Sequence, residues 1–431
     1  MFKAYSEYKN SGVEWLGEVP GHWEQKPLRN LYNRVKITNC PTEQLLSIYR
    51  EYGVIPKDSR DDNHNVASED LSPYQFVDKN YLVVNKMKAW QGSLAISQYK
   101  GIISPAYFIY QPLHKFNHYY IHYLLRSSFY IQTYKNSSKG IRVGQWDLDD
   151  YTFHRMNLLI PPIPEQTQIA NFLDQETKKI DQLIAKQEKL IELLEEQRKS
   201  IISHAVTKGL NPNVEMKDSG VEWLGEVPEH WVVGKIKNFA TVNPKITKYA
   251  LSENEYIEFI PMANIDDIKG KVSSIDYRKF KEVSSGYTAF NNNDVIFAKI
   301  TPCMENGNCA VIPHLKFGFG FGSTEFIVFR AKDNRHTEFL YFILRNPYLR
   351  NICKQFMTGT AGQQRISSEF LANYPVALPP VEEQNEIVDY LEKENQKIDK
   401  IIQKQTALID KLKEYRSSII SHAVTGKIDV R

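Results

Sequence analysis

The chain repeats itself once, and this repeat constrains its fold more than any other feature. The segment NSGVEWLGEVPGHW begins at Asn10 and DSGVEWLGEVPEHW begins at Asp218, 208 positions later. Further on, PPIPEQ at Pro161 returns as PPVEEQ at Pro379, and RKSIISHAVT returns as RSSIISHAVT, both 218 positions later. Two copies of this length are too long for solenoid units, so we predict two similar domains related by pseudo-two-fold symmetry.

Length and composition indicate a globular protein with several domains. The 431 residues predict about two to four domains of roughly 100–200 residues each. Hydrophobic residues make up 42% and charged residues 24% of the chain, which is enough apolar material for real cores. No apolar run approaches the roughly 18 residues of a membrane span, and the first residues, MFKAYSEYKNSG, hold no apolar signal-peptide region. We therefore expect a cytoplasmic protein without a membrane partner.

The cysteines and the net charge limit the kinds of site to expect. The four cysteines form no CxxC pair and no histidine cluster stands near them, so we expect reduced thiols rather than a zinc site. The formal net charge of +3 does not require a nucleic-acid partner, although basic residues can still gather on one face.

Each half divides into a part that differs between the copies and a part that is nearly the same. The differing parts, about residues 24–160 and 232–378, read as mixed strand and helix in the same order. Runs rich in β-branched and aromatic residues predict strands, and the longer apolar runs predict helices. The predicted strands are residues 81–85, 101–110, 294–300 and 323–331, and the predicted helices are residues 118–127 and 337–346.

The similar parts, about residues 161–210 and 379–431, predict two long helices. From Glu165 to Val206 there is neither glycine nor proline, and the apolar residues follow a seven-residue period that is typical of a coiled coil. Helices of ~40 residues are about 60 Å long, and Gly209 and Gly426 are expected to stop them. The predicted seam consists of Ile169, Leu173, Ile180, Leu183, Leu190, Leu194 and Ile201, and of Ile387, Leu391, Ile398, Ile401, Leu408, Leu412 and Ile419 in the second copy.

The predicted fold class is α+β, with two pseudo-symmetric α/β domains separated by an antiparallel coiled coil of the two long helices. The helices should be antiparallel because each domain precedes its own helix. The heptad is broken at the equivalent residues Gln187 and Gln405, both near the middle of their helices. We predict that these amides meet and fix the register, at some cost in stability. The alternative, that both face solvent from flanking positions, remains open.

The first 23 residues copy the segment that follows the first helix, so the termini should resemble the central junction. Trp15, Trp23, Trp223 and Trp231 lie in these junctions. We predict that they anchor domain to helix, and stacking on bases is the alternative.

No catalytic motif is recognisable. There is no GxxxxGK[ST] phosphate loop, no HExxH or serine-elbow pattern, and no DPPY- or NPPF-like tetrapeptide of an amino-methyltransferase. The run FGFGFGS from Phe317 lacks the strand-then-helix setting of a cofactor loop, and a turn between two strands is expected instead. A loose nuclease signature remains untested by these patterns.

Two pairs of polar loops have the chemistry of DNA reading. In the first half these are NKMKAWQGS (residues 85–93) and SKGIRVGQWD (138–147), and in the second AKITPCMENGN (298–308) and GTAGQQRISS (359–368). Lysine and arginine bind phosphates, the amides of Asn and Gln match adenine, and glycines allow close backbone approach. Because the loops recur on either side of the same strand and helix, we predict that they face a ligand.

These features together resemble the specificity subunit of type I restriction–modification systems (HsdS). The resemblance rests on SGVEWLGEVPxHW, ITPCMENGN, FGSTEFIVFR, GTAGQQRISSEFLANYPVALPP, EEQNEIVDYL and RSSIISHAVT, which span nearly the whole chain. The first half departs more, since NKMKAWQGS stands for ITPCxENG and WDLDDYTF for the SSEFL form. Its contact residues are therefore defined less sharply.

The resemblance implies a non-catalytic chain that reads a bipartite, asymmetric double-stranded DNA target with a non-specific spacer. Two methyltransferase subunits would dock on the similar parts and supply S-adenosylmethionine chemistry. Two translocase–nuclease subunits would use ATP and magnesium, and this chain itself would hold no cofactor. The implied domains are residues 1–160 and 216–378 for target recognition, and 161–215 and 379–431 for helical spacers.

The residues expected to contact DNA lie in the four loops and the strands beside them. They are Asn85, Lys86, Lys88, Trp90, Gln91, Ser104, Tyr107, Arg142, Gln145, Lys299, Thr301, Glu305, Asn306, Asn308, Ser323, Thr324, Gln363, Gln364 and Arg365. Three other interpretations stay open: a related system with different partner enzymes, a fused methylase or nuclease with an unrecognised site, and a structural adaptor that binds no DNA.

Overall fold

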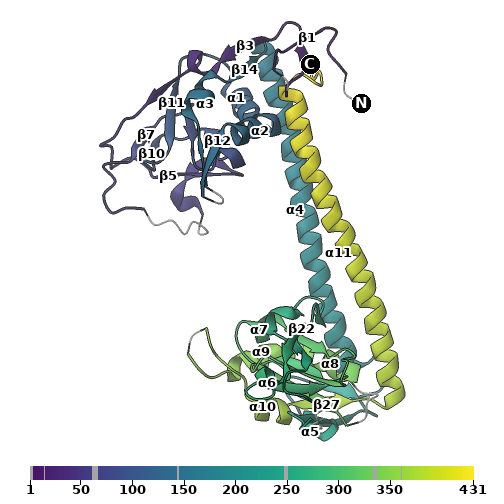
Figure 1. The fold of residues 1–431 in the computed structure, drawn as a ribbon. Helices are drawn as coiled ribbons and strands as arrows, with labels where there is room; N and C mark the ends of the chain where they lie inside the picture. The colour runs from purple at the N-terminus through teal and green to yellow at the C-terminus, as the bar shows by residue number, and fades with distance from the viewer. Residues whose placement is uncertain are drawn as a thin grey trace. The chain divides into compact units, whose positions relative to one another are not determined.

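The computed structural model describes residues 3–13, 15–60, 67–142, 145–246, 251–332, 337–360 and 362–431, without the side chains of residues 141, 142 and 145. The chain forms two compact units, of residues 1–188 with 406–431 and of residues 189–405. Each unit combines one mixed strand-and-helix domain with one end of each long helix (Figure 1). The mixed helix and strand content confirms the predicted fold class.

The first unit is organised around a four-stranded antiparallel sheet in the order β4-β11-β8-β9. These strands are Tyr32–Val35, Phe108–Pro112, Leu82–Val84 and Leu94–Ile96. Helices α1 (His118–Leu125) and α2 (Ser128–Asn136) bury Tyr120, Leu124 and Tyr130 in the main core. The smaller elements are β1 (Tyr8–Asn10), β2 (Glu18–Pro20), β3 (Glu24–Pro27), β5 (Leu46–Tyr49), β6 (Gly53–Pro56), β7 (Gln75–Val77), β10 (Gly101–Ile103), β12 (Ser138–Arg142), β13 (Gln145–Leu148), α3 (Asp150–Arg155) and β14 (Asn157–Ile160).

The second unit repeats this sheet as β18-β27-β24-β25, with strands Ala240–Val242, Phe326–Ala331, Val295–Ala298 and Cys309–Val311. Helices α8 (Thr337–Arg345) and α9 (Pro347–Phe356) follow it, as α1 and α2 follow the first sheet. A second sheet, β22-β19-β26-β23, contains one parallel pair, β19 with β26. The other elements are β15 (Met216–Asp218), β16 (Glu226–Pro228), β17 (Val232–Lys235), α5 (Ile236–Phe239), β19 (Tyr256–Ile260), β20 (Ile265–Asp266), β21 (Lys271–Val272), β22 (Asp276–Lys279), α6 (Phe280–Val283), β23 (Thr288–Asn291), α7 (Cys303–Asn306), β26 (Phe319–Gly322), α10 (Ser368–Asn373) and β28 (Pro375–Leu378).

The matching strand orders confirm that the differing parts are copies of one fold. The flanking pairs correspond as well, since β3 pairs with β14 and β17 pairs with β28. Most predicted strands and both predicted helices form, within a few residues of their expected ends. The order of secondary-structure elements could therefore be predicted from the sequence of each half.

Two local predictions about strands in the sheets were wrong. The expected strand 101–110 is two strands, β10 and β11, because residues 104–107 turn around Pro105. The run from Phe317 is largely strand β26, not a turn, with Phe319 and Phe321 buried. Its glycines sit against neighbouring backbone: a Cβ on Gly322 would lie 2.5 Å from the carbonyl oxygen of Ile260. The alternation of Phe and Gly is thus a strand pattern in which glycine permits close strand packing.

The long helices α4 (Ile163–Lys208) and α11 (Val381–Val424) extend slightly beyond their predicted limits. Gly209 follows α4 directly with a φ of 75°, a left-handed conformation that ends helices readily. In the first unit Arg416 donates to Asp181 at 2.8 Å, and in the second Arg198 donates to Asp399 at 2.5 Å. In each unit, the start of one helix therefore contacts the end of the other, which confirms the antiparallel pairing.

The predicted seam is only partly buried. Ile169, Leu173, Ile387 and Leu391 are fully buried, because the domain beside them covers the helix pair as well. Nearer the middle, Leu183, Leu190, Ile401 and Leu408 are 44%, 38%, 40% and 40% exposed. A pair of helices has no third wall to cover these side chains, so the seam is partly exposed there. Gln187 belongs to the first unit and Gln405 to the second, so their meeting remains a prediction.

The ends of the chain do resemble the central junction. Lys427, after α11, donates to the carbonyl oxygens of Leu16 at 3.2 Å and Glu18 at 2.7 Å. Lys208, at the end of α4, donates to the carbonyl oxygens of the equivalent residues Leu224 and Glu226. The N-terminal segment therefore packs on the end of α11 as residues 216–228 pack on the end of α4. Among the described residues, none of the helices is both long and apolar enough to cross a membrane.

Candidate nucleic-acid interface

In the second unit the two predicted loops meet directly. Ile300 and Arg365 form a β-bridge, and the Thr301 N–H donates to the Gln364 carbonyl at 3.0 Å. The Gln364 N–H donates in turn to Thr301 Oγ1 at 3.1 Å. The start of β27 joins them, because the Lys299 N–H donates to the Glu325 carbonyl at 2.9 Å. Segments 299–301, 323–325 and 363–366 therefore form one surface, and it holds Lys299, Thr301, Ser323, Thr324, Gln363, Gln364 and Arg365.

Arg365 is held by Glu325, a residue that the sequence did not single out. Its Nε and Nη2 each donate to one carboxylate oxygen at 2.9 Å, and its Nη1 donates to the Gln363 carbonyl at 3.3 Å. These hydrogen bonds lower the pKa of Glu325. Since a guanidinium carries five N–H groups, one on each terminal nitrogen has no partner among the described residues and is available to a ligand. The only sequence signal was that Glu325 follows Ser323 and Thr324.

The rest of the 298–308 loop is less uniformly exposed. Glu305 and Asn306 are exposed at the end of α7, and Lys354 lies 3.2 Å from the Glu305 carboxylate. Asn308 is only 9% exposed, and its side-chain amide donates to the Ile265 carbonyl at 3.2 Å. That amide holds β20 to the loop, so the structure favours a role in folding for Asn308 over a base contact.

In the first unit the corresponding loops also lie together. The Leu148 N–H donates to the Lys86 carbonyl at 3.1 Å, and Lys86 Nζ lies 3.3 Å from Asp147. The Trp90 and Trp146 rings are 5.0 Å apart, inclined by 31°. The predicted loop 138–147 is a hairpin of β12 and β13 rather than a loop, and this local prediction was wrong. Paired strands satisfy the backbone groups that an open loop would leave unbonded.

Other predicted residues in this unit differ in setting. Asn85, Gln91, Ser104 and Tyr107 are partly buried, whereas Lys88 is exposed. The backbones of Arg142 and Gln145 are register partners at the tip of the hairpin, but their side chains lie outside the described part of the chain. Arg34, which the sequence did not suggest, stacks 3.9 Å above the Phe108 ring. This guanidinium also pairs with Asp150 at 2.8 Å, so its charge beside these loops is balanced.

The junction tryptophans anchor the domains, as predicted. Trp23 is fully buried and its indole N–H donates to Glu165 on α4 at 3.0 Å. Trp231 is also fully buried and donates to Glu383 on α11 at 3.1 Å. His22 and His230 approach the same carboxylates at 2.8 and 2.7 Å. Trp15 and Trp223 pack instead on Tyr130 and Tyr374, with ring centroids 5.3 and 4.7 Å apart.

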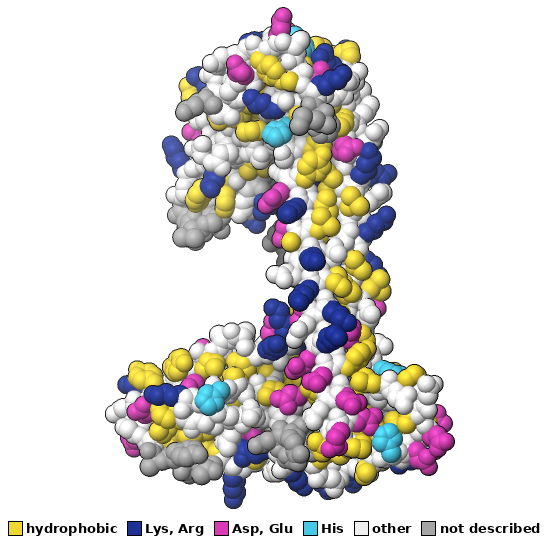
Figure 2. Space-filling view, turned by 90° about the vertical axis from the view of Figure 1, so that its right-hand side faces the viewer, with side chains coloured by type: hydrophobic (Ala, Val, Ile, Leu, Met, Phe, Trp, Pro, Cys, Tyr) yellow, Lys and Arg dark blue, Asp and Glu magenta, His cyan; other side chains and the backbone are white. Residues whose placement is uncertain are grey.

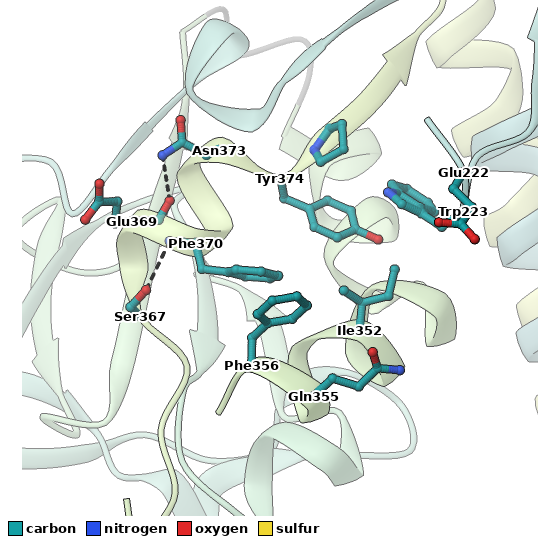
Figure 3. A pocket seen from close by; sticks show the side chains of 11 residues that line it. Glu222, Trp223, Ile352, Gln355, Phe356, Ser367, Glu369, Phe370, Asn373 and Tyr374 are labelled. Atoms are coloured by element: carbon teal, nitrogen blue, oxygen red, sulfur yellow. Dashed lines mark hydrogen bonds between the residues drawn. The ribbon is translucent and has the colours of Figure 1, made fainter. Parts of the chain in front are cut away.

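An apolar pocket lies beside Trp223, and Ser367 of the predicted loop 359–368 is among its lining residues (Figure 3). Its volume is about 840 Å³. Phe356 and Phe370 both line it, and their rings stack with centroids 4.8 Å apart. The Trp223 indole N–H and the Tyr374 hydroxyl are buried there without a hydrogen-bond partner among the described residues.

Comparison with known proteins gives the class of this chain. Residues 20–193 and 228–411 match the family described as type I restriction modification DNA specificity domain. The chain therefore belongs to the family of type I restriction–modification specificity subunits, which confirms the resemblance. The two matches coincide with the two copies of the repeat.

Individual relatives agree. Over 164 residues the chain is 35% identical to the EcoEI specificity subunit of Escherichia coli, covering 38% of this chain and 27% of the relative. The match thus spans about a quarter of that relative. The MjaX specificity subunit of Methanocaldococcus jannaschii, whose assignment is provisional, is 23% identical over 100% of this chain and 99% of its own length.

Solved structures show the same fold. A chain from a type I restriction–modification system, from work on its complex assembly and conformational transition, has a TM-score of 0.68 at 14% identity. That match covers 94% of this chain and 98% of the other. The HsdS subunit from Thermoanaerobacter tengcongensis has a TM-score of 0.53 at 15% identity, covering 95% and 98%.

Proposed function

We propose that this specificity subunit reads a bipartite, asymmetric double-stranded DNA target, one half with each differing domain. The recurrence of the same sheet and loop pair in both units carries the proposal. Surface 299–301, 323–325 and 363–366 would read one half, and residues 85–91 with the β12–β13 hairpin the other. Residues 1–160 and 216–378 are then the recognition domains, and 161–215 and 379–431 the spacers.

The chemistry of the loops supports base and phosphate contacts. The free N–H groups of Arg365 match the O6 and N7 acceptors of guanine, and the amides of Gln363 and Gln364 match adenine. Lys88 and Lys299 suit phosphates. Each wrong base pair would cost about 1–3 kcal/mol, so two half-sites together give high selectivity.

The long helices offer a surface for partner subunits. The exposed apolar residues at Leu183 and Leu408 in the first unit have equivalents at Ile401 and Leu190 in the second. Hydrophobic side chains lie along the exposed face of these helices (yellow in Figure 2). Repeated apolar positions on an otherwise charged helix are typical of a protein-binding face. Two methyltransferase subunits would dock there, one per unit.

The partner subunits would supply the catalytic activity, and this chain would supply recognition of the DNA target. Methyltransferase subunits would bring S-adenosylmethionine, and two translocase–nuclease subunits would bring ATP and magnesium, all in the cytoplasm. Sequencing the methylated bases of a host that expresses the chain with its methyltransferase tests the proposal. A bipartite methylated motif is expected, and methylation by the purified chain alone would favour a fused enzyme instead.

A further inference from the structure

A cluster of positive side chains lies where α4 meets α8 and α9 in the second unit. Arg198 and Lys199 on α4, Arg345 at the end of α8 and Arg350 on α9 line one pocket of about 150 Å³. Water in bulk occupies ~30 Å³ per molecule, so the pocket has room for a small polyatomic anion. Asn306, one of the predicted DNA contacts, lines the same pocket. The cluster is therefore continuous with the candidate interface.

Two of the guanidinium groups have no carboxylate partner among the described residues. Arg345 is only 8% exposed and donates to the carbonyls of Ile268 at 2.7 Å and Asp267 at 3.2 Å, and to Tyr341. Arg350 donates to the Arg345 carbonyl at 2.7 Å, but its buried Nε has no acceptor in the part of the chain that the structure describes. Neutral carbonyls offset a buried charge only in part.

The position of Arg350 is itself a tight fit. A Cβ on Gly307 would lie 2.0 Å from Arg350 Nη1, and Gly307 has a φ of 98°. Only glycine lets the loop after α7 lie against this guanidinium. Burial and the nearby charge of Arg345 lower the pKa of Arg350 to about 10. The protein therefore holds two like charges close together at a cost that a bound anion would relieve.

The acidic residues of the pocket do not cancel this charge. The lining contains two acids, Glu195 and Asp267, against four cations. Glu195 lies 3.2 Å from Arg198 Nε, yet that nitrogen has no acceptor in hydrogen-bond geometry. Arg198 also bonds Asp399, so its charge is already balanced. With Asp399 included, the four cations face three carboxylates, so the described residues around the pocket keep a net positive charge of one.

The first unit has a pair of arginines equivalent to Arg198 and Arg345. Arg416 is the equivalent of Arg198, and Arg126 ends α1 as Arg345 ends α8. Arg126 also donates to backbone carbonyls, those of Leu94 in β9 at 3.1 Å and Glu51 at 3.0 Å. Burial and the charge of Arg416 lower its pKa to about 10. An arginine of a long helix thus approaches an arginine of the domain in both halves.

We propose that the pocket of Arg198, Lys199, Arg345 and Arg350 binds a phosphate group of the DNA backbone beside the half-site. This inference rests on the proposed function and adds a contact that carries no base information. Phosphate oxygens would accept from Arg350 Nε, which has no acceptor among the described residues, and would offset the neighbouring charges of Arg345 and Arg350. Such contacts fix the position of a protein on the duplex without reading its sequence.

DNA binding by the full chain in complex with its methyltransferase subunits tests this. Fluorescence anisotropy would compare a duplex carrying the methylated motif with a scrambled duplex, at several salt concentrations. For Arg350→Gln we expect about tenfold weaker binding to both duplexes and a salt slope lower by about one, the signature of one lost phosphate contact. Lys237→Gln is the control. Lys237 is exposed on α5, outside the pocket, and its substitution removes one positive charge, as Arg350→Gln does.

Each outcome decides between specific accounts. Wild-type protein that shows no salt-dependent binding would overturn the proposed function itself. If the wild type binds DNA and Arg350→Gln binds with the same affinity, only the phosphate site is overturned. The same holds if Arg350→Gln loses affinity only for the duplex that carries the methylated motif. Stabilisation of the wild type by inorganic phosphate, with Arg350→Gln still binding DNA normally, would assign the pocket to a free anion and also overturn it. If Arg350→Gln does not fold, exposed Lys199→Gln replaces it, with about threefold weaker binding expected.

Discussion

Arg365 and Glu325 form a two-point ion pair in which both carboxylate oxygens are 2.9 Å from the guanidinium. The pair joins the loop before α10 to the start of β27. It leaves the outer edge of the guanidinium toward solvent, where the side chain is 44% exposed. This relationship makes Glu325 a positioning residue for the DNA contact that we assign to Arg365.

Replacing Arg365 with Ala is expected to weaken recognition of one half-site only, by about tenfold against single-base variants of that half. Methylation rates on duplexes altered in one half at a time measure this. Glu325→Gln keeps the shape but loosens the pair, so a smaller loss in the same half is expected. Equal losses in both halves would contradict the modular reading.

The anchoring carboxylates should stabilise their own units. Glu383→Ala removes the acceptor of the buried Trp231 indole N–H, and we expect a loss of about 1–3 kcal/mol in the free energy of unfolding. Urea denaturation followed by tryptophan fluorescence measures it. Glu382→Ala, at an exposed neighbour, is the control and should change stability by less than about 0.5 kcal/mol. Equal effects of the two substitutions would contradict the anchoring role.

Acidification should destabilise the first unit through His114. Partial burial, and then the neighbouring His118, lower the pKa of His114 to about 4, and its ring stacks on Phe116 at 4.9 Å. An unfolded histidine binds a proton near pH 6.5. Between about pH 6.5 and 4 the unfolded state therefore holds more protons than the folded state, and the free energy of unfolding decreases as the pH is lowered. The slope is at most ~1.4 kcal/mol per pH unit for this group. His114→Phe should flatten the dependence of the unfolding midpoint on pH, and an unchanged slope would refute the assignment.

Docking of methyltransferase subunits should depend on the exposed apolar residues of the long helices. Leu183→Asp with Leu408→Asp is expected to abolish co-purification with the methyltransferase while leaving the melting temperature of the free chain nearly unchanged, since both residues are exposed. Gln182→Asp, exposed on the same helix, adds a similar charge and should have no effect. Retained assembly in the double variant would move the docking surface elsewhere.

The sequence carried the duplicated architecture because its signals are local. Alternating apolar strands, a seven-residue apolar period without glycine or proline, and stop glycines such as Gly209 determine where elements begin and end. Misreadings occurred where tertiary packing decides. The Phe–Gly alternation at β26 needs a neighbouring strand to make sense, and Pro105 divides a run that composition alone reads as one strand. The exposure of Leu183 and Leu408 depends on what covers the helix, which periodicity does not contain.

The sequence predicted which loops form the candidate interface, but not how their side chains are arranged. Recurrence of polar glycine-rich loops indicated segments 298–308 and 359–368, and these do meet. Glu325, Arg345 and Arg350 were missed because their roles depend on partners distant in sequence: the Arg365 pair spans 40 positions. Asn308 was chosen by residue type, and its burial was visible only in three dimensions.

The most direct test of the account is the methylated motif of a host that expresses this chain with its methyltransferase, read by sequencing of modified bases. We predict two short specific halves separated by a spacer of constant length, and a change in one half alone when residues 24–160 are exchanged for those of a relative. Inserting one helical turn, about 5.4 Å, into both long helices should lengthen the spacer by about one or two base pairs at about 3.4 Å each. A continuous motif, or an exchange that alters both halves, would contradict the proposal that two similar domains each recognise one half of the target.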